Sequence, residues 1–152
     1  MKTKYITAFL AVAIVVAAQL RAATGPVVNV VIVANDQMKY SVTKINAQPG
    51  QTIHVQLKNE GTLPKQVMGH NWILLKAGND VAAYAAAAVS AAKENYQPKS
   101  LADQVLAFIP LLGPKQQGEV TFTAPEKPGT YVYFCSFPAH FQAGMRGELV
   151  VK

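Results

Sequence analysis

The feature that most constrains this chain is a short loop near its C-terminus that carries three different metal-binding side chains. The loop contains Cys135, His140 and Met145, and Cys135 is the only cysteine among 152 residues. Strand-like apolar runs flank it at 131–134 and 148–151. A thiolate, an imidazole and a thioether together suit copper, because a mononuclear blue-copper centre takes two histidines, one cysteine and a long, weak axial methionine. The loop therefore predicts a fold in which one more histidine, from another strand, reaches back to it.

The first 22 residues are expected to lie outside the fold. Lys2 and Lys4 give a basic start, an apolar run spans 6–18, and the segment ends in a small residue at Ala22. This is the layout of a secretory signal peptide. The apolar run is shorter than the roughly 20 residues that cross a bilayer. Residues 1–22 are therefore predicted to direct export to the periplasm or another extracytoplasmic space, with a retained membrane anchor as the alternative.

The length of the remaining chain, residues 23–152, indicates one domain. Without the first 22 residues it carries eleven Lys/Arg and eight Asp/Glu, so its net charge is +3. No run of basic residues occurs, and nothing in this composition favours a nucleic-acid partner. A single cysteine cannot form an internal disulfide, and a free thiol in an oxidising compartment needs protection by burial or metal. Cys135 is therefore expected to be a metal ligand.

Alternating apolar and polar residues predict short β-strands along most of the chain. The β-branched run 27–33 is a strand, and 38–46 alternates loosely up to a Pro-Gly turn at 48–50. Residues 52–57 alternate strictly, which marks a half-buried strand, and 118–124 does the same. About seven strands separated by turns indicate an antiparallel β-sandwich.

One stretch interrupts this pattern. Residues 80–94 are rich in alanine and begin with Asp80, a good N-cap, so they predict a helix. Such a helix between strands would form a flap over one side of the sandwich. Residues 101–112 are apolar but contain Pro110, and the sequence does not separate helix from strand there.

Two histidines compete for the role of the distant ligand. His54 lies on the polar face of an alternating strand and is expected to be an ordinary exposed residue. His70 follows Gly69 and precedes Asn71 and Trp72, in apolar surroundings. Alone, it would be a core histidine bonded to a main-chain carbonyl. Together with the Cys/His/Met loop it completes the minimal set for a copper site clamped between two sheets.

With these residues, the sequence resembles the azurin-type blue-copper proteins of the cupredoxin family. The resemblance is carried by three segments, 35–38 (Asn-Asp-Gln-Met), 63–72 (Leu-Pro-Lys-Gln-Val-Met-Gly-His-Asn-Trp) and 135–140 (Cys-Ser-Phe-Pro-Ala-His). It implies an all-β, Greek-key cupredoxin sandwich with one helical insert over 23–152. It also implies that the protein is not an enzyme but transfers single electrons by Cu(I)/Cu(II) cycling.

The resemblance further implies one type 1 copper per chain. His70, Cys135 and His140 would be its ligands, Met145 a weak axial ligand, and the Gly69 carbonyl would face the metal from the opposite side. Asn71 would join the two ligand segments by hydrogen bonds near Cys135 and Ser136. Trp72, one residue further along the strand, is expected in the core.

The chain departs from the azurin pattern in four places. Four residues separate His140 from Met145 where azurins have three, which is closer to the auracyanins. The azurin disulfide is impossible with one cysteine. Asn59 stands where azurins carry a histidine beside the site, which argues against a pH-linked histidine switch. Ala139 stands where the family usually has glycine.

The family suggests a c-type cytochrome or a membrane redox complex as partner, docking transiently near His140. Only the edge of His140 is expected to approach the surface, surrounded by an apolar patch suited to brief encounters. That expected patch comprises Met38, Leu63, Val67, Met68, Phe137, Pro138 and Ala139.

Other functions fit the residues less well. A Cys135–His140 nucleophile lacks an obvious residue to orient the histidine, and copper enzymes with a second metal centre need more histidines than the leftover His54. A periplasmic copper carrier without a redox role would favour exposed, Met- or His-rich ligands. A zinc site is disfavoured by the thioether.

Overall fold

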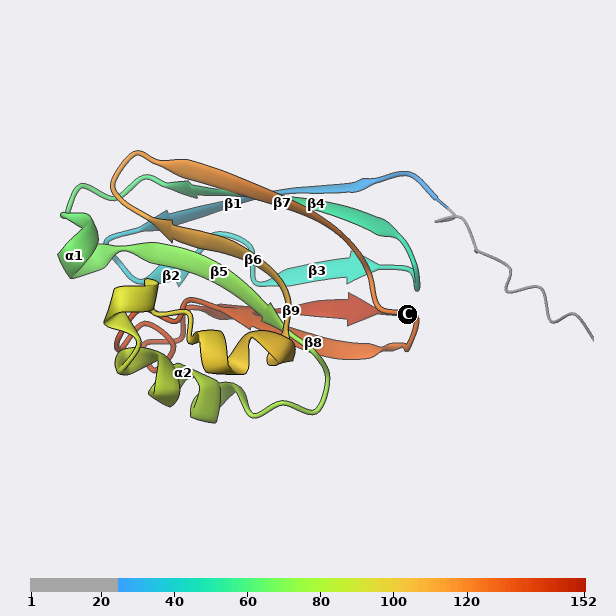
Figure 1. The fold of residues 1–152 in the computed structure, drawn as a ribbon. Helices are drawn as coiled ribbons and strands as arrows, with labels where there is room; N and C mark the ends of the chain where they lie inside the picture. Colours follow the sequence, from blue (N-terminus) through green and yellow to red (C-terminus); the bar gives the residue numbers. More distant parts are fainter. Residues whose placement is uncertain (1–24) are drawn as a thin grey trace, which may run out of the picture.

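The computed structural model describes residues 25–152, which form two β-sheets packed face to face (Figure 1). The predicted leader, residues 1–22, lies outside the described residues. The four-stranded sheet has the order β2-β1-β4-β7 and the five-stranded sheet the order β3-β9-β8-β5-β6. The strands are β1 (Val28–Asn35), β2 (Lys39–Tyr40), β3 (Lys44–Ala47), β4 (Thr52–Asn59), β5 (His70–Leu75), β6 (Val105–Leu112), β7 (Gln117–Thr123), β8 (Gly129–Phe134) and β9 (Arg146–Val151).

The sequence predicted antiparallel sheets, but each of the two sheets contains one parallel pair of strands. β1 runs parallel to β4 and β3 parallel to β9, while the other pairs are antiparallel. The chain crosses between the sheets after β2, so β3 and β9 meet as strands far apart in sequence, and such crossovers permit parallel pairing. The β-sandwich itself is confirmed.

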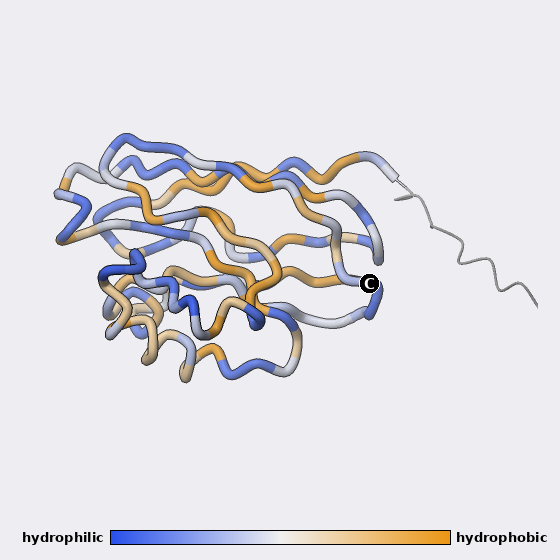
Figure 2. Tube along the Cα trace, viewed as in Figure 1, coloured by the Kyte–Doolittle hydropathy of each residue, from blue (hydrophilic) through white to orange (hydrophobic). Residues whose placement is uncertain are grey.

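Alternation of side chains builds the core. In β4, Ile53, Val55 and Leu57 are fully buried between the sheets, while the residues between them are partly exposed. Figure 2 shows the same alternation of hydrophobic and hydrophilic residues along the strands. β5 is buried at every residue, because one face meets the core and the other meets the flap. The predicted core position of Trp72 is confirmed, since its side chain is 0% exposed.

The flap lies against the outer face of the five-stranded sheet (Figure 1). It comprises α2 (Val81–Val89) and the 3₁₀ turns η1 (Ala92–Glu94) and η2 (Lys99–Gln104). Asp80 caps α2 as predicted, with its carboxylate accepting from the N–H groups of Ala82 and Ala83. Tyr84 and Ala85 pack on Ile73 and Phe134 of the sheet.

The flap helix is shorter than predicted. α2 ends at Val89 rather than Glu94, and Asn95 and Tyr96 adopt positive φ angles of 54° and 60°. The alanine-rich sequence could continue a helix, but the turn brings the Tyr96 carbonyl to the Ser136 hydroxyl, which donates to it. Here a tertiary contact outweighs intrinsic propensity.

The undecided segment 101–112 is divided between the end of η2 and the edge strand β6. Pro110 is tolerated because β6 has no neighbour on one side and because the β5–β6 register shifts between His70 and Trp72. This β-bulge lies beside the first histidine of the predicted site and re-aims the start of β5.

Candidate metal centre

His70 is positioned by a short helix packed against the start of β5. Helix α1 (Lys65–Met68) ends at Gly69, and His70 follows as the first residue of the strand. A Cβ on Gly69 would lie 2.7 Å from the Lys65 carbonyl oxygen and 3.0 Å from the Leu111 side chain. Only glycine therefore allows α1 to pack this closely, and the His70 side chain is 0% exposed as a result.

The second ligand segment is a compact turn between β8 and β9. Cys135 follows the last residue of β8, and its N–H donates to the Met145 carbonyl at 3.1 Å. The Met145 N–H donates in turn to the His140 carbonyl at 2.9 Å. Ala139 and Gly144 have φ angles of 68° and 86°, so Ala139 adopts the left-handed conformation that favours glycine. The loop thereby folds all three of its predicted ligands toward one point.

The structure brings His70, Cys135 and His140 together. Their ligand atoms all lie within 4.8 Å of one another, and all three residues are buried. The two imidazole rings are 4.9 Å apart, and Cys135 Sγ lies 3.4 Å from His140 Nδ1. Met145 is fully buried in the same core cluster as Cys135. The carbonyl of Gly69 belongs to the residue directly before His70.

One observation shows that this cluster fits a metal. Within residues 25–152, both ring nitrogens of His70 are buried and neither has a hydrogen-bond partner. Buried polar atoms are almost always paired, so an orphaned imidazole calls for an explanation. A soft thiolate, two imidazoles and a nearby thioether form the donor set of a blue-copper site.

Burial favours the neutral form of each of the three titratable side chains at the site. It raises the pKa of the Cys135 thiol to about 12, opposed by hydrogen bonds from the N–H groups of Asn71 and Phe137. Burial, reinforced by His70, lowers the pKa of His140 to about 4. The pKa of His70 is also lowered by burial, against the opposing effects of the Asn35 carbonyl and the Asp36 carboxylate. A cation at this point would replace the thiol proton, so metal binding is coupled to proton release.

The predicted link through Asn71 is present. Its amide nitrogen donates to Ser136 Oγ at 2.8 Å, and its amide oxygen accepts from the Ser136 N–H at 2.9 Å. The Tyr40 hydroxyl donates to the Asn71 carbonyl. These bonds fix the strand that carries His70 against the loop that carries Cys135. Such outer contacts orient ligands and tune the metal.

Three contacts at the site were not predicted. The Lys39 ammonium donates to the Ala143 carbonyl in the ligand loop, Tyr96 receives the Ser136 hydroxyl, and Tyr40 holds Asn71. In all three the acceptor is a main-chain carbonyl, which carries no residue-type signal.

Six of the seven residues expected in the apolar patch are exposed or half-buried. Leu63 and Val67 are 41% and 57% exposed, and Ala139 is also exposed. Met38, Met68 and Pro138 are half-buried. The apolar patch is hereafter these six residues.

Phe137 does not belong to the patch, which corrects the expectation. It is buried, and its ring packs 4.8 Å from His140 and 4.9 Å from Tyr96. His140 itself is only 2% exposed, so its edge barely reaches the surface. Phe137 therefore supports the ligand from beneath rather than presenting a contact surface.

Two further polar candidates lie in β4. His54 is a partly exposed strand residue whose Nδ1 lies 3.0 Å from Thr121 Oγ1. Asn59 is buried at the end of β4, where its amide donates to the Leu112 carbonyl at 3.3 Å. None of the helices in 25–152 is long and apolar enough to span a bilayer.

Comparison with known proteins agrees with this geometry. Residues 27–152 match the family model described as copper binding proteins, plastocyanin/azurin family. Auracyanin-A from Chloroflexus aurantiacus is 37% identical over 131 residues, covering 85% of this chain and 76% of the relative. Azurin from Pseudomonas denitrificans is 36% identical over 124 residues, covering 80% and 95%. Auracyanin-B from C. aurantiacus is 35% identical over 78% of this chain, which spans about half of that relative's length (49%).

Solved structures of auracyanins also resemble this chain. Reduced auracyanin from Roseiflexus castenholzii superposes with a TM-score of 0.73 at 34% identity, covering 84% of this chain and 99% of the other. Auracyanin A, a blue copper protein from C. aurantiacus, gives 0.73 at 35% identity, covering 84% and 100%. The relatives are electron-transfer proteins rather than enzymes, and the cofactor is copper. The chain belongs to the plastocyanin/azurin family of copper-binding proteins.

Proposed function

We propose that this protein is an exported blue-copper electron carrier. His70, Cys135 and His140 would hold the metal, with the Met145 thioether and the Gly69 carbonyl as weaker additional ligands. The observation that carries the proposal is the buried convergence of the three donors within 4.8 Å. Bound copper supplies one-electron chemistry by cycling between Cu(I) and Cu(II).

The chain's own residues would keep the site rigid and dry. The Asn71–Ser136 hydrogen bonds hold the two ligand segments in one arrangement. The main-chain N–H groups of Asn71 and Phe137 act to lower the pKa of the Cys135 thiol, which favours its thiolate form. Because these groups are fixed by the surrounding strands, the site need not rearrange when its charge changes. A non-redox copper carrier is less well supported, because fully buried ligands oppose exchange.

Electrons would enter and leave beside His140, under the apolar patch. A c-type cytochrome or a membrane redox complex would dock there transiently. The proposal also includes a signal peptide at residues 1–22, followed by the copper-binding domain at 23–152. Mass spectrometry of the exported protein would test that part: a mature N-terminus near residue 23 is expected, and an intact Met1 start would contradict it.

The visible spectrum after addition of Cu(II) tests the redox site. We expect an intense blue band that bleaches on reduction, reaches its maximum at one equivalent of copper, and is lost in Cys135→Ser. His54→Ala, which alters a histidine away from the site, is the matched control and should retain the band. A colourless protein, or a band that survives Cys135→Ser, would contradict the proposal.

A further inference from the structure

The flap contacts the chain on both sides of Cys135. Tyr84 of α2 packs edge-on against Phe134, the residue before Cys135, with the ring centroids 5.7 Å apart. The main-chain carbonyl of Tyr96 accepts a hydrogen bond from the hydroxyl of Ser136, the residue after Cys135. The flap is therefore joined to this ligand segment at two points, in addition to covering the sheet.

The flap also supports His140 through aromatic rings. The ring of Tyr96 lies 4.9 Å from that of Phe137, which lies 4.8 Å from the His140 imidazole. On the other side of His140, the ring of Phe141 packs 5.6 Å from that of Phe134, within the apolar cluster that joins α2 to the sheet. Residues on both sides of each of these two ligands are thus tied to the flap.

The hydrogen bond between Ser136 and Tyr96 has a fixed direction. The amide oxygen of Asn71 accepts from the Ser136 N–H, so its amide nitrogen is the group that faces Ser136 Oγ at 2.8 Å. An amide nitrogen can only donate, which leaves the Ser136 hydroxyl proton for the Tyr96 carbonyl. The chain of bonds from Asn71 through Ser136 to Tyr96 therefore connects the strand of the first histidine with the cysteine loop and the flap. Consecutive hydrogen bonds in a buried site reinforce one another.

The turn that brings Tyr96 to the ligand loop is strained. Asn95 and Tyr96 both have left-handed φ angles, 54° and 60°. A bulky side chain rarely adopts this conformation, which persists only where the surrounding structure imposes it and which is concentrated at functional sites. What the strained conformation provides here is contact with Ser136 and Phe137.

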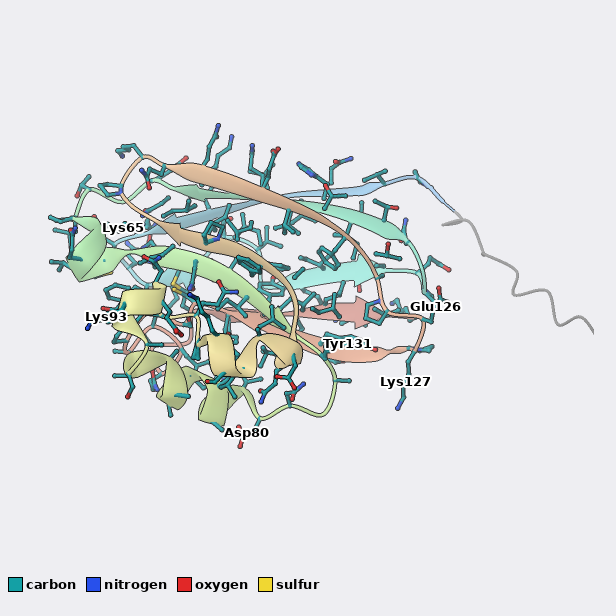
Figure 3. All side chains as sticks on the ribbon, viewed as in Figure 1. Lys65, Asp80, Lys93, Glu126, Lys127 and Tyr131 are labelled. Atoms are coloured by element: carbon teal, nitrogen blue, oxygen red, sulfur yellow. The ribbon has the colours of Figure 1, made fainter. Side chains whose placement is uncertain are left out.

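The strained turn lies at the same end of the sandwich as α1. Lys93 is in η1, three residues before Tyr96, and Figure 3 shows it at the same end as Lys65 of α1. This end is called the α1 end below. A hollow of about 280 Å³, lined by residues of both segments, lies between α1 and the turn. The position of the turn is therefore tied to the ligand loop more closely than to α1.

We propose that the flap is a positioning element of the copper site and that Tyr96 is its main positioning residue. This inference rests on the proposed electron-transfer function and deepens it. Tyr96 fixes the Cys135 loop through its carbonyl and the His140 ring through Phe137. Outer contacts of this kind orient metal ligands. Because the flap holds both ligands in place, the site changes little when copper changes its oxidation state, and electron transfer stays fast.

Electron self-exchange between the Cu(I) and Cu(II) forms of the protein tests this role. One electron passes from the Cu(I) of one molecule to the Cu(II) of another, so the reaction has no driving force and needs no partner protein. Tyr96→Ala removes the ring, and we expect the self-exchange rate constant to fall about tenfold. The blue absorption band and the paramagnetic resonance spectrum of the Cu(II) protein should shift as well. These spectra report the site alone, so they separate a changed site from changed contact between molecules.

Two conservative variants are the matched controls. Tyr96→Phe keeps the ring and the main-chain carbonyl, so its self-exchange rate should stay within about twofold of the wild type. Tyr84→Phe changes the other flap tyrosine in the same way. Within residues 25–152 the buried Tyr84 hydroxyl has no hydrogen-bond partner, so its removal should alter neither the spectra nor the self-exchange rate.

The contrary result is a loss of stability with an unchanged site. If Tyr96→Ala lowers the melting temperature but keeps the spectra and self-exchange rate of the wild type, the proposal is overturned and Tyr96 is a packing residue only. If Tyr96→Ala does not fold, Tyr96→Leu keeps apolar bulk at this position and should give smaller shifts in the same direction; wild-type spectra in that variant would equally overturn the proposal. A wild-type protein without a blue band would instead refute the proposed function itself.

Discussion

The body of the sandwich and its α1 end bury opposite kinds of side chain. Between the sheets the buried residues are apolar, as in β4 and β5. At the α1 end the chain buries five polar residues, Asn59, His70, Asn71, Ser136 and His140. Burying a polar group is costly unless it is paired. Hydrogen bonds satisfy Asn59, Asn71 and Ser136, whereas among residues 25–152 neither ring nitrogen of His70 has a hydrogen-bond partner.

Metal chemistry is therefore separated from the body of the sandwich. Side chains in the body should affect the free energy of unfolding alone, whereas side chains at the α1 end should affect copper binding and reduction potential as well as stability. The following predictions test that separation, beginning with the largest effect.

Truncation in the body should cost the most stability and leave the site alone. Ile53 is 0% exposed in β4, so Ile53→Ala should lower the free energy of unfolding by about 4 kcal/mol through lost burial and a cavity. Urea unfolding measures the loss, and the blue band of the folded protein should keep its position. A shifted band with unchanged stability would contradict the separation.

Acid should destabilise the copper-free protein through the α1 end. The pKa of His140 lies at about 4 in the folded chain, below its ordinary value of 6.5. The unfolded chain therefore binds more protons between these values, and stability is lost as pH falls from 6.5 to 4, by about 3 kcal/mol from this group. Urea unfolding of the metal-free protein at several pH values measures it. His140→Gln should flatten the profile, and an unchanged profile in that variant would refute the assignment.

Removing the Asn71 side chain should affect both stability and potential. Asn71→Ala leaves the buried Ser136 N–H without its partner, at a cost of about 2 kcal/mol. It also loosens the loop that carries Cys135, so the reduction potential should change. Ser136→Ala is the matched variant, because it keeps the N–H bond and should cost less. Redox titration and urea unfolding measure the reduction potential and the stability of the two variants. Equal losses of stability in Asn71→Ala and Ser136→Ala would contradict the role given to the Ser136 N–H bond.

The smallest effect is expected at Lys39. Lys39→Met removes the bond to the Ala143 carbonyl and frees the turn between His140 and Met145. Stability should change by less than about 1 kcal/mol, as for an exposed side chain. The absorption and paramagnetic resonance spectra of the Cu(II) protein should nevertheless shift, because the turn positions Met145. Lys44→Met, an exposed residue of β3, should leave both spectra unchanged.

The same division explains what sequence could predict. The strict alternation at 52–57 and the capping residue Asp80 correctly indicated a strand and a helix start, because local pattern decides them. The three clustered donors were also predicted, since His70, Cys135 and His140 are rare residues in distinctive contexts.

What failed depended on tertiary contacts. The early end of α2 follows from the Ser136–Tyr96 contact, and the burial of Phe137 follows from its packing between Tyr96 and His140. Parallel pairing of β3 with β9 joins segments about a hundred residues apart, which periodicity cannot reveal. Lys39 contacts a main-chain carbonyl and leaves no sequence trace.

The copper site is tested most directly by a crystal structure of the copper-loaded protein with anomalous scattering recorded at the copper edge. We expect one copper peak per chain, bonded to the imidazoles of His70 and His140 and to the Cys135 sulfur, with Met145 and the Gly69 carbonyl at longer range. A copper peak elsewhere, or one that lacks the Cys135 sulfur, would contradict it.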